Sequence, residues 1–355
     1  MNINIISPIN QLGYGIAGLN IVKSLTKENH ISLWTIGRPE VTTDDDYKCV
    51  LSCTQNAQIP DFHAPCVRIW HQHDMAQFVG KGRKIGFPFF ELTQFNNVEK
   101  AHLTYLDKIF VCSQWAKDIV LNNINRNTSD VCVVPLGVDV DIFQPSDIID
   151  GPTIFFNCGK WEIRKGHDIL PDIFNLAFRP DDNVELWMMC SNPFLSDEET
   201  KRWKDLYTNT NLGSKIRFID RKNTQKEVYN IMQQIDCGVF PARAEGWNLE
   251  ILELLSCGKH IITTNYSGHT EFCNTHNCLL VDIDQYETAY DGKWFHGNGG
   301  SWAKITQKEV EEFAMYMRHI HDMKQRQDLK RNNNGVDTSH TFTWRHTSEQ
   351  IVKYV

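Results

Sequence analysis

The 355-residue sequence has no apolar run long enough to cross a bilayer, no low-complexity tract and no excess of basic residues. Crossing a bilayer takes about 20 consecutive apolar residues, so we expect no stable membrane insertion. The net charge of −8 argues against general binding to nucleic acid or to anionic membranes. The chain begins directly with an apolar strand pattern and no signal peptide, which favours a cytoplasmic location.

The eleven cysteines include no C-x-x-C pair. Several lie within apolar runs, where a free thiol packs as a small hydrophobic group. An odd count without paired spacing argues against a disulfide framework. We therefore predict reduced, packed thiols, which are typical of a cytosolic protein.

The central feature of the sequence is a predicted strand, loop and helix over residues 237–258. An apolar strand over 237–240 leads through a loop containing Glu245 into a helix over 249–255, which Gly258 closes. The first N–H groups of a helix are unpaired and its dipole is positive there, so this helix start can bind an anion. Glu253 lies two turns into the helix. Glu245 could therefore contact a ligand at the start of the helix, and Glu253 could contact it along the side of the helix. In the alternative interpretation, Glu245 only caps the helix and Glu253 is a solvated surface residue.

The same stretch resembles the E-x7-E segment of retaining glycosyltransferases with the GT-B fold, family 4 in particular. The family pattern is P-S-x-x-E-G-F-G-x-x-x-x-E-A-M-x-x-G, and Trp247 and Asn248 depart from its Phe-Gly pair. Two further segments are similar to family patterns: residues 133–145 to P-N-G-V-D-x-x-x-F-x-P, and residues 159–166 to G-R-L-x-x-x-K-G.

This resemblance implies an α/β protein with two Rossmann-like βαβ domains that face a cleft. We expect an acceptor domain over residues 1–147 and a nucleotide-sugar donor domain over residues 151–339. Residues 340–355 are expected to form a C-terminal helix that crosses back to the first domain. The segment 282–305 fits no predicted element.

The resemblance also implies roles for residues of the donor domain. Lys160 and Lys165 take the positions of the family's Arg and Lys, which clamp the donor diphosphate, and Arg164 is a third candidate. Cations are suited to this role because negative charge grows on a diphosphate as it leaves. Glu245 would contact the sugar and Glu253 the ribose hydroxyls. Further donor-binding candidates lie at the helix start: Trp247, Asn248 and Leu249. In the alternative, 160–165 is a basic turn on a solvated edge.

A glycine-rich loop follows the first predicted strand, with Gly13, Gly15 and Gly18 in a G-x-G-x-x-G pattern. This pattern also occurs in dinucleotide-binding proteins, but there the second strand ends in an acid, and the strand over 31–36 does not. By the resemblance, Gly13 and Gly15 let the donor phosphate or the acceptor approach the backbone. A tight turn without a ligand is the alternative.

Two histidines follow a strand predicted over 67–70, at the carboxyl end where open α/β sheets bind ligands. The resemblance favours His73 as a sugar-contacting histidine, with His71 nearly as plausible. A metal site formed by His71, His73 and Asp74 is an alternative, as is a purely structural histidine.

The resemblance thus implies retaining transfer of one hexose from a nucleotide-diphosphate sugar, UDP-sugar favoured, to an acceptor hydroxyl. His73, Glu245 and Lys165 would be catalytic, with no metal or other cofactor required. An NAD(P)-dependent oxidoreductase and a catalytically inactive sugar-nucleotide-binding module are the alternatives. The sequence does not identify the acceptor, which could be a glycan, lipid, protein, small molecule or nucleic acid.

Overall fold

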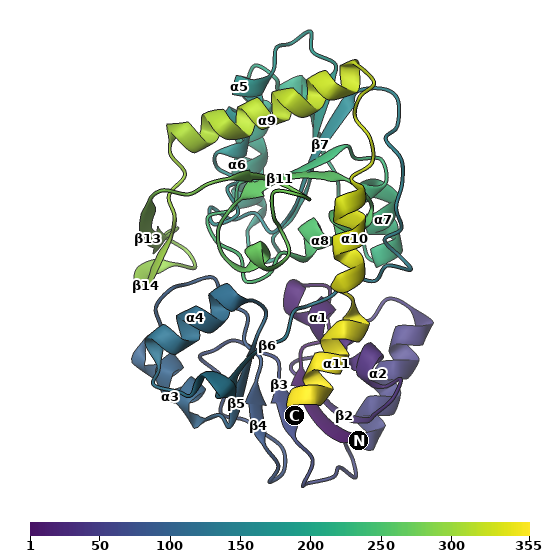
Figure 1. The fold of residues 1–355 in the computed structure, drawn as a ribbon, viewed down its shortest axis with the longest axis vertical. Coiled ribbons are helices and arrows are strands. Elements are labelled where there is room, and N and C mark those ends of the chain that lie inside the picture. The colour runs from purple at the N-terminus through teal and green to yellow at the C-terminus, as the bar shows by residue number, and fades with distance from the viewer. The chain divides into compact units, whose positions relative to one another are not determined.

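A computed structural model describes residues 1–355 as two units (Figure 1). The first comprises residues 1–138, 298–300 and 342–355, and the second comprises residues 139–297 and 301–341. Each unit contains a six-stranded parallel sheet, which confirms the predicted α/β class.

The sheet of the first unit has the strand order β2-β1-β3-β4-β5-β6. Ile5 of β1 and Val67 of β3 are register partners and are fully buried, as expected for parallel strands covered on both faces. The strands are β1 (Asn2–Ser7), β2 (His30–Thr35), β3 (Cys66–Arg68), β4 (Lys84–Gly86), β5 (Lys108–Val111) and β6 (Val131–Val133). The helices of this unit are α1 (Gly13–Leu25), α2 (Asp44–Asn56), α3 (Asn97–Tyr105), α4 (Gln114–Asn123), α11 (Trp344–Tyr354) and the short 3-10 helix η1 (Thr128–Asp130).

Strand β3 is shorter than predicted, because it ends at Arg68 and not at Trp70. The Arg68 side chain binds Asp74, in the loop that follows the strand. Its Nε donates to the Asp74 carbonyl at 2.8 Å and its Nη2 to the Asp74 carboxylate at 2.7 Å. Ile69 is fully buried beyond the strand end, so the apolar pattern continues where the ladder does not.

The last helix, α11, packs with the first unit although it is last in the chain. Figure 1 shows it in yellow beside the purple α1. Ser24 and Ser348 hydroxyls are 2.9 Å apart, and the Thr347 hydroxyl donates to the Pro135 carbonyl at 2.8 Å. Ile351 of α11 is fully buried.

The sheet of the second unit has the order β12-β11-β10-β7-β8-β9. Its strands are β7 (Thr153–Gly159), β8 (Val184–Cys190), β9 (Ile216–Phe218), β10 (Cys237–Phe240), β11 (His260–Thr264) and β12 (Leu279–Val281). Its helices are α5 (Leu170–Ala177), α6 (Asp197–Thr208), α7 (Gln225–Met232), α8 (Leu249–Ser256), α9 (Gln307–Gln325), α10 (Asn333–Thr341) and the 3-10 helices η2 (Gly213–Lys215) and η3 (Gly268–Glu271). The segment that fitted no predicted element contains an antiparallel hairpin, β13 (Tyr286–Tyr290) and β14 (His296–Ala303).

Two helix starts are capped by side chains of the types that favour this position. Ser113 caps α4, where its hydroxyl accepts a hydrogen bond from the Ala116 amide at 3.2 Å. Thr224 and Glu227 form a capping box at the start of α7. In both, a short side chain satisfies an amide that has no partner inside the helix.

The units divide between Val138 and Asp139, earlier in the chain than the predicted end of the first domain at 147. Residues 139–147 lie with the second unit because they bind the end of α8 and the residues after it. The Ser256 hydroxyl donates to the Phe143 carbonyl at 2.5 Å, and the Ser146 amide to the Cys257 carbonyl at 3.0 Å.

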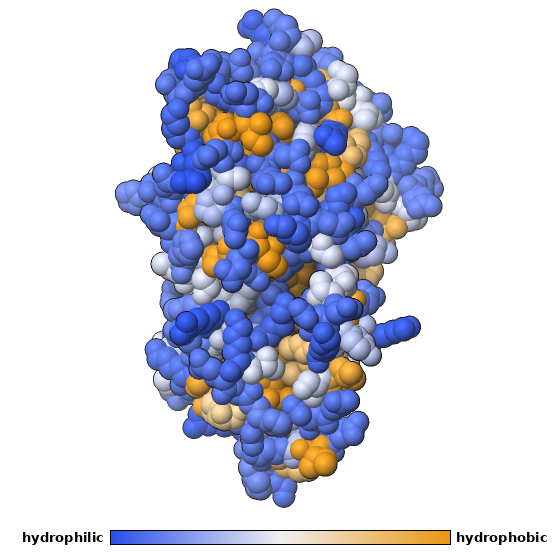
Figure 2. Space-filling model, turned by 90° about the vertical axis from the view of Figure 1, so that its right-hand side faces the viewer, coloured by the Kyte–Doolittle hydropathy of each residue, from blue (hydrophilic) through white to orange (hydrophobic).

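None of the helices combines the length and the apolar surface that crossing a bilayer requires. On the face shown in Figure 2, hydrophobic residues form separate patches among hydrophilic ones. All eleven cysteines are free, and all except Cys49 are buried, as the sequence predicted for packed thiols.

Candidate functional site

The candidate site of the second unit is formed by the loops that follow β7 and β10, which are neighbours in the sheet. Loops at the carboxyl ends of parallel strands meet at one edge of a sheet, where α/β proteins bind ligands. Arg243 joins the two loops, because its guanidinium donates to both carboxylate oxygens of Asp168 at 2.8 and 2.9 Å. The Arg243 amide also donates to the Arg164 carbonyl at 2.7 Å.

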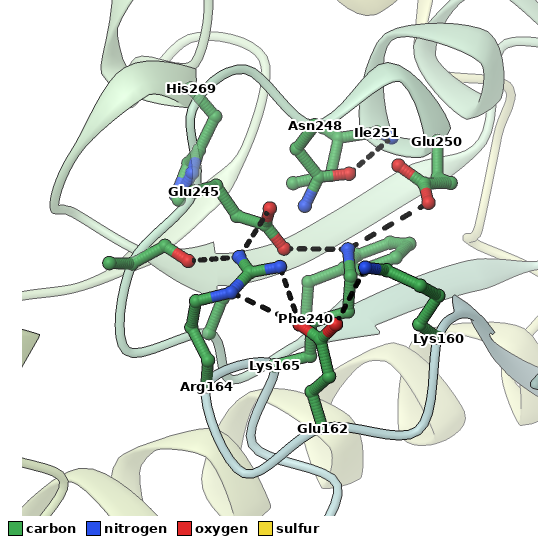
Figure 3. Close-up of polar contacts among 12 residues, drawn as sticks. Lys160, Glu162, Arg164, Lys165, Phe240, Glu245, Asn248, Glu250, Ile251 and His269 are labelled. Carbon is green, nitrogen blue, oxygen red and sulfur yellow. Dashed lines mark hydrogen bonds and ion pairs between the residues drawn. The ribbon is translucent and has the colours of Figure 1, made fainter. Parts of the chain in front are cut away.

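Five charged side chains converge there, and we call them the polar cluster: Lys160, Glu162, Arg164, Lys165 and Glu245 (Figure 3). Glu245 accepts a hydrogen bond on each carboxylate oxygen. Arg164 Nη1 donates to one oxygen at 2.9 Å and Lys165 Nζ to the other at 2.8 Å. Arg164 Nη1 also donates to the Ala244 carbonyl at 2.6 Å. The structure thus brings together Arg164, Lys165 and Glu245, which sequence reasoning singled out separately.

Glu162 is a member of the cluster that sequence reasoning missed. Its carboxylate accepts from Arg164 Nε at 3.1 Å and Nη2 at 2.7 Å, and it lies 2.9 Å from Lys160 Nζ. The signal in the sequence was its place between Lys160 and Arg164, where every second residue is charged. Glu162 therefore fixes the orientation of two cations through an almost completely buried carboxylate.

The buried cations control the ionisation of Glu245. Burial by itself raises the pKa of a carboxyl group, but Lys165 and Arg164 outweigh burial and lower the pKa of Glu245 to about 2. For Lys165, burial opposes the charged form, but Glu245 and then Glu250 raise its pKa above the ordinary value. Both side chains are therefore charged at neutral pH and held in place by each other.

Close approach of the two loops depends on Gly166. Its φ of +74° lies in the left-handed region, and a Cβ atom there would be 2.0 Å from the Pro241 carbonyl oxygen. Any side chain would push the loops apart. This glycine follows Lys165 directly, so it also determines where the Lys165 backbone lies.

Asn248 explains one departure from the family pattern, which has glycine at this position. Its φ of +79° is a left-handed conformation that Asn tolerates better than most residues. Its side-chain oxygen accepts from the Ile251 amide at 3.2 Å and caps α8. The buried Nδ2 atom has no hydrogen-bond partner in the chain, so it can donate to a ligand.

Three more predicted residues belong to α8 or precede it. Leu249 is the first residue of the helix, and Trp247 packs its ring 4.8 Å from that of Phe272. Glu253 is buried on α8, and burial, with Glu250 as a second cause, raises its pKa well above the ordinary value. The alternative interpretation, in which Glu253 is a solvated surface residue, is wrong, because only 9% of the residue is exposed.

The remaining predicted residues lie in the first unit. Gly13 and Gly15 are in the first turn of α1 and not in a loop before it. A Cβ atom at Gly15 would be 2.3 Å from the Asn10 amide nitrogen, so Gly15 serves close packing of the chain. Gly13 is exposed with open space around it, so its backbone remains accessible to a ligand.

Tyr14, between these glycines, connects them to the histidines and was not singled out from the sequence. Its ring lies 4.7 Å from His71 and is stacked 4.5 Å from Phe89. Its hydroxyl donates to the Phe89 carbonyl at 2.6 Å. His71 is stacked in turn on His73, at 5.3 Å, and His73 is exposed. The structure therefore gathers the predicted glycines and histidines of the first unit around one tyrosine.

The metal alternative has no support in this geometry. No group of three His, Cys, Asp or Glu side chains is arranged to hold a metal ion. The Asp74 carboxylate, the third proposed ligand, is paired with Arg68.

Comparison with known proteins finds a family match for the region that carries the polar cluster. Residues 139–291 match the family described as glycosyl transferases group 1. No curated protein matches the chain in sequence.

Solved structures with the same fold include several glycosyltransferases. Sucrose-phosphate synthase (tll1590) from Thermosynechococcus elongatus matches with a TM-score of 0.72 and 15% identity, over 99% of this chain and 98% of that one. Anabaena Alr3699/HepE in complex with UDP-glucose gives 0.72 and 14% over the same shares. The lipopolysaccharide outer core galactosyltransferase WaaB gives 0.64 and 12% over the whole of both chains. The chain thus has the GT-B fold, and its residues 139–291 are similar to the glycosyl transferases group 1 family.

Proposed function

We propose that this protein is a retaining glycosyltransferase that moves one hexose from a nucleotide-diphosphate sugar to an acceptor hydroxyl without a metal ion. The match of residues 139–291 to group 1 glycosyl transferases supports the class of reaction. The fold shared with HepE, which was solved in complex with UDP-glucose, favours a UDP-sugar as donor. The free, buried thiols favour a reaction in the cytoplasm.

The observation that carries the proposal is a loop with three cations, of which Lys165 reaches the start of α8. Lys160, Arg164 and Lys165 lie in one loop, and Lys165 Nζ is also 3.8 Å from Glu250 in the first turn of that helix. A diphosphate bound there would meet lysine charges and the unpaired amides of Asn248 and Leu249. A helix start contributes about 0.3–2 kcal/mol toward an anion, so the lysines supply the larger part.

In the reaction, the bond between the sugar anomeric carbon and the diphosphate oxygen breaks, and the acceptor oxygen bonds to the same face of that carbon. The leaving phosphate takes the acceptor's proton, so the products are the glycoside and the protonated nucleoside diphosphate. Lys160 and Lys165 stabilise the charge that grows on the diphosphate. Glu245 contacts the sugar, and Glu253 binds the ribose hydroxyls.

In the first unit, we assign Gly13 and His73 to contacts with the sugar or the acceptor, and Gly15 to positioning them. Gly13 offers an exposed backbone, and His73 is an exposed ring held by stacking on His71. Gly15 acts by letting the first turn of α1 pack closely against Asn10. Tyr14 lies between the two glycines in the sequence and packs its ring against His71, so it supports both the glycines and the histidines.

A donor panel tests the proposal. The pure protein is incubated with UDP-, GDP-, ADP- and dTDP-sugars in the presence of a chelator, and the released nucleoside diphosphate and the thermal shift are measured together. Slow hydrolysis of one donor, with stabilisation by its diphosphate, is the expected result. Stabilisation without release, even with acceptors added, would instead indicate an inactive binding module.

The panel also includes NAD and NADP, because the glycine-rich start of α1 is shared with oxidoreductases. No observation in the structure favours that function, since the polar cluster would have no role in it. Activity that the chelator abolishes and Mn²⁺ restores would contradict the metal-free mechanism and return attention to His71, His73 and Asp74.

A further inference from the structure

Beside the polar cluster, the second unit has a groove of about 620 Å³, within the size range of small-molecule sites. Three segments line it: residues 161–163 after β7, helix α6 with Leu195 before it, and the turn 291–294 between β13 and β14. Only Glu162 belongs to both the groove and the polar cluster. The groove is therefore a neighbouring feature and not the donor site itself.

Aromatic rings form much of the groove and its rim. Trp161 and Trp203 are stacked with their ring centroids 5.7 Å apart and their planes within 12°. Trp294 and Phe194 are also 5.7 Å apart, nearly edge to face, and are 43% and 55% exposed. Exposed aromatic rings of this kind offer flat apolar surfaces next to polar groups, which suits the C–H faces of sugar rings.

The turn that carries Trp294 is held in place by hydrogen bonds. One carboxylate oxygen of Asp291 accepts from the amides of residues 293, 294 and 295 at 2.9, 2.7 and 2.9 Å. Lys293 Nζ reaches to Glu199 of α6 at 2.5 Å. The turn is thus tied to the opposite side of the groove, and little freedom is lost when a ligand binds.

The charges along the groove already have partners. Glu199 is paired with Lys293, Arg202 with Glu198, and Glu162 with Arg164 and Lys160. Asp291 has no cation partner and accepts only from backbone amides, but no unpaired cation is left to attract a phosphate, and no group of three His, Cys, Asp or Glu side chains is arranged to hold a metal ion. Among the buried side-chain polar atoms of the lining, the indole Nε1 of Trp161 lacks a hydrogen-bond partner, and this residue is 1% exposed. The lining therefore suits an uncharged ligand rich in hydroxyl groups.

We propose that this groove binds a neutral oligosaccharide, with Trp294 as the exposed platform and the Trp161 indole as a hydrogen-bond donor. The inference goes beyond the proposed function, because it concerns a second carbohydrate site in the unit that carries the polar cluster. It is tested in the absence of any donor, so its outcome does not depend on sugar transfer.

The test uses maltohexaose, cellohexaose and laminarihexaose as probes, with binding followed by tryptophan fluorescence and by isothermal titration calorimetry. We expect at least one probe to bind, and Trp294→Ala to weaken that binding by roughly tenfold or more, equivalent to about 1.4 kcal/mol. Phe62→Ala, which removes a 56% exposed aromatic residue of the first unit, is the matched control and should bind as the unchanged protein does.

Three outcomes would overturn the inference. The first is that no hexasaccharide binds, and the second is that Trp294→Ala binds as well as the Phe62→Ala control. The third is a response to UDP alone that Trp294→Ala removes, since this would assign the groove to the donor. If transfer fails in the donor panel while Trp294-dependent binding persists, the proposed function is wrong and this inference stands.

Discussion

At the scale of single residues, the most informative change is Lys165→Ala. Lys165 is the buried cation nearest the start of α8. In the proposed reaction it stabilises the negative charge that develops on the leaving diphosphate. We expect turnover to fall about 100- to 1,000-fold, as for the loss of other groups that stabilise transition-state charge. The fold should persist, because Glu245 keeps its pairing with Arg164.

Release of nucleoside diphosphate measures the effect, and circular dichroism reports the fold. Lys201→Ala, which removes an exposed lysine of α6, is the control and should leave the rate unchanged. A folded Lys165→Ala protein with a near-normal rate would disprove the diphosphate role.

Glu245 links stability to pH. Its pKa in the folded protein is about 2, below the ordinary value of 4.5. The stability gained from its ionised form is fully present above pH 4.5 and is lost as the pH falls toward 2. Glu245→Gln should therefore lower the melting temperature at pH 7 and reduce its decline between pH 4.5 and 2. The exposed control Glu198→Gln should follow the unchanged protein, and an identical acid profile for Glu245→Gln would show that the pairing is weak in solution.

Glu253 is expected to act on the nucleotide and not on the chemical step. Glu253→Ala should weaken binding of the free nucleoside diphosphate about tenfold, the loss of one or two hydrogen bonds. Calorimetric titration of the diphosphate measures this change, with the exposed Glu311→Ala of α9 as control. Unchanged affinity would rule out the assignment of Glu253 to the ribose.

At the scale of elements, Asn248 tests how α8 begins. Asn248→Gly keeps the left-handed backbone and loses only the cap, so it should cost a few tenths of a kcal/mol. Asn248→Ala loses the cap and also strains the backbone, so it should cost about 1–2 kcal/mol more. Denaturant unfolding compares the two, and equal stabilities would mean that the positive φ imposes no strain in solution.

The elements that the sequence predicted best are strands buried on both faces. The apolar run at 237–240 became β10, because a short, continuous apolar run is typical of a parallel strand that is buried on both faces. The hairpin β13–β14 could not be predicted. Its residues 296–301 are polar or glycine, and they become a strand only through pairing with β13.

The candidate site was predictable in part for a similar reason. Glu245 and Lys165 stand in recognisable local segments. Their pairing is a contact between residues 80 positions apart, which no local pattern contains. The same holds for Tyr14, whose hydroxyl binds Phe89 from 75 positions away. Long-range hydrogen bonds thus decided which candidates act together.

At the scale of the whole molecule, the chain order makes the first unit depend on the last residues. Residues 342–355 belong with residues 1–138, and α11 covers α1 through Ile351 and the Ser24–Ser348 hydrogen bond. Removing residues 342–355 should therefore destabilise the first unit and leave the second intact. Hydrogen exchange would show this as faster exchange in β1 and α1, with unchanged protection of β7 and β10.

Arg345→Ala, an exposed change on α11, is the control and should leave exchange unaffected. The truncated chain should also keep its thermal shift with nucleoside diphosphate, because the polar cluster and α8 lie wholly in the second unit. Loss of that shift together with faster exchange in β7 and β10 would show that the units do not fold independently. In that case the last fourteen residues would stabilise the entire chain, and the assignment of separate roles to the two units would have to be abandoned.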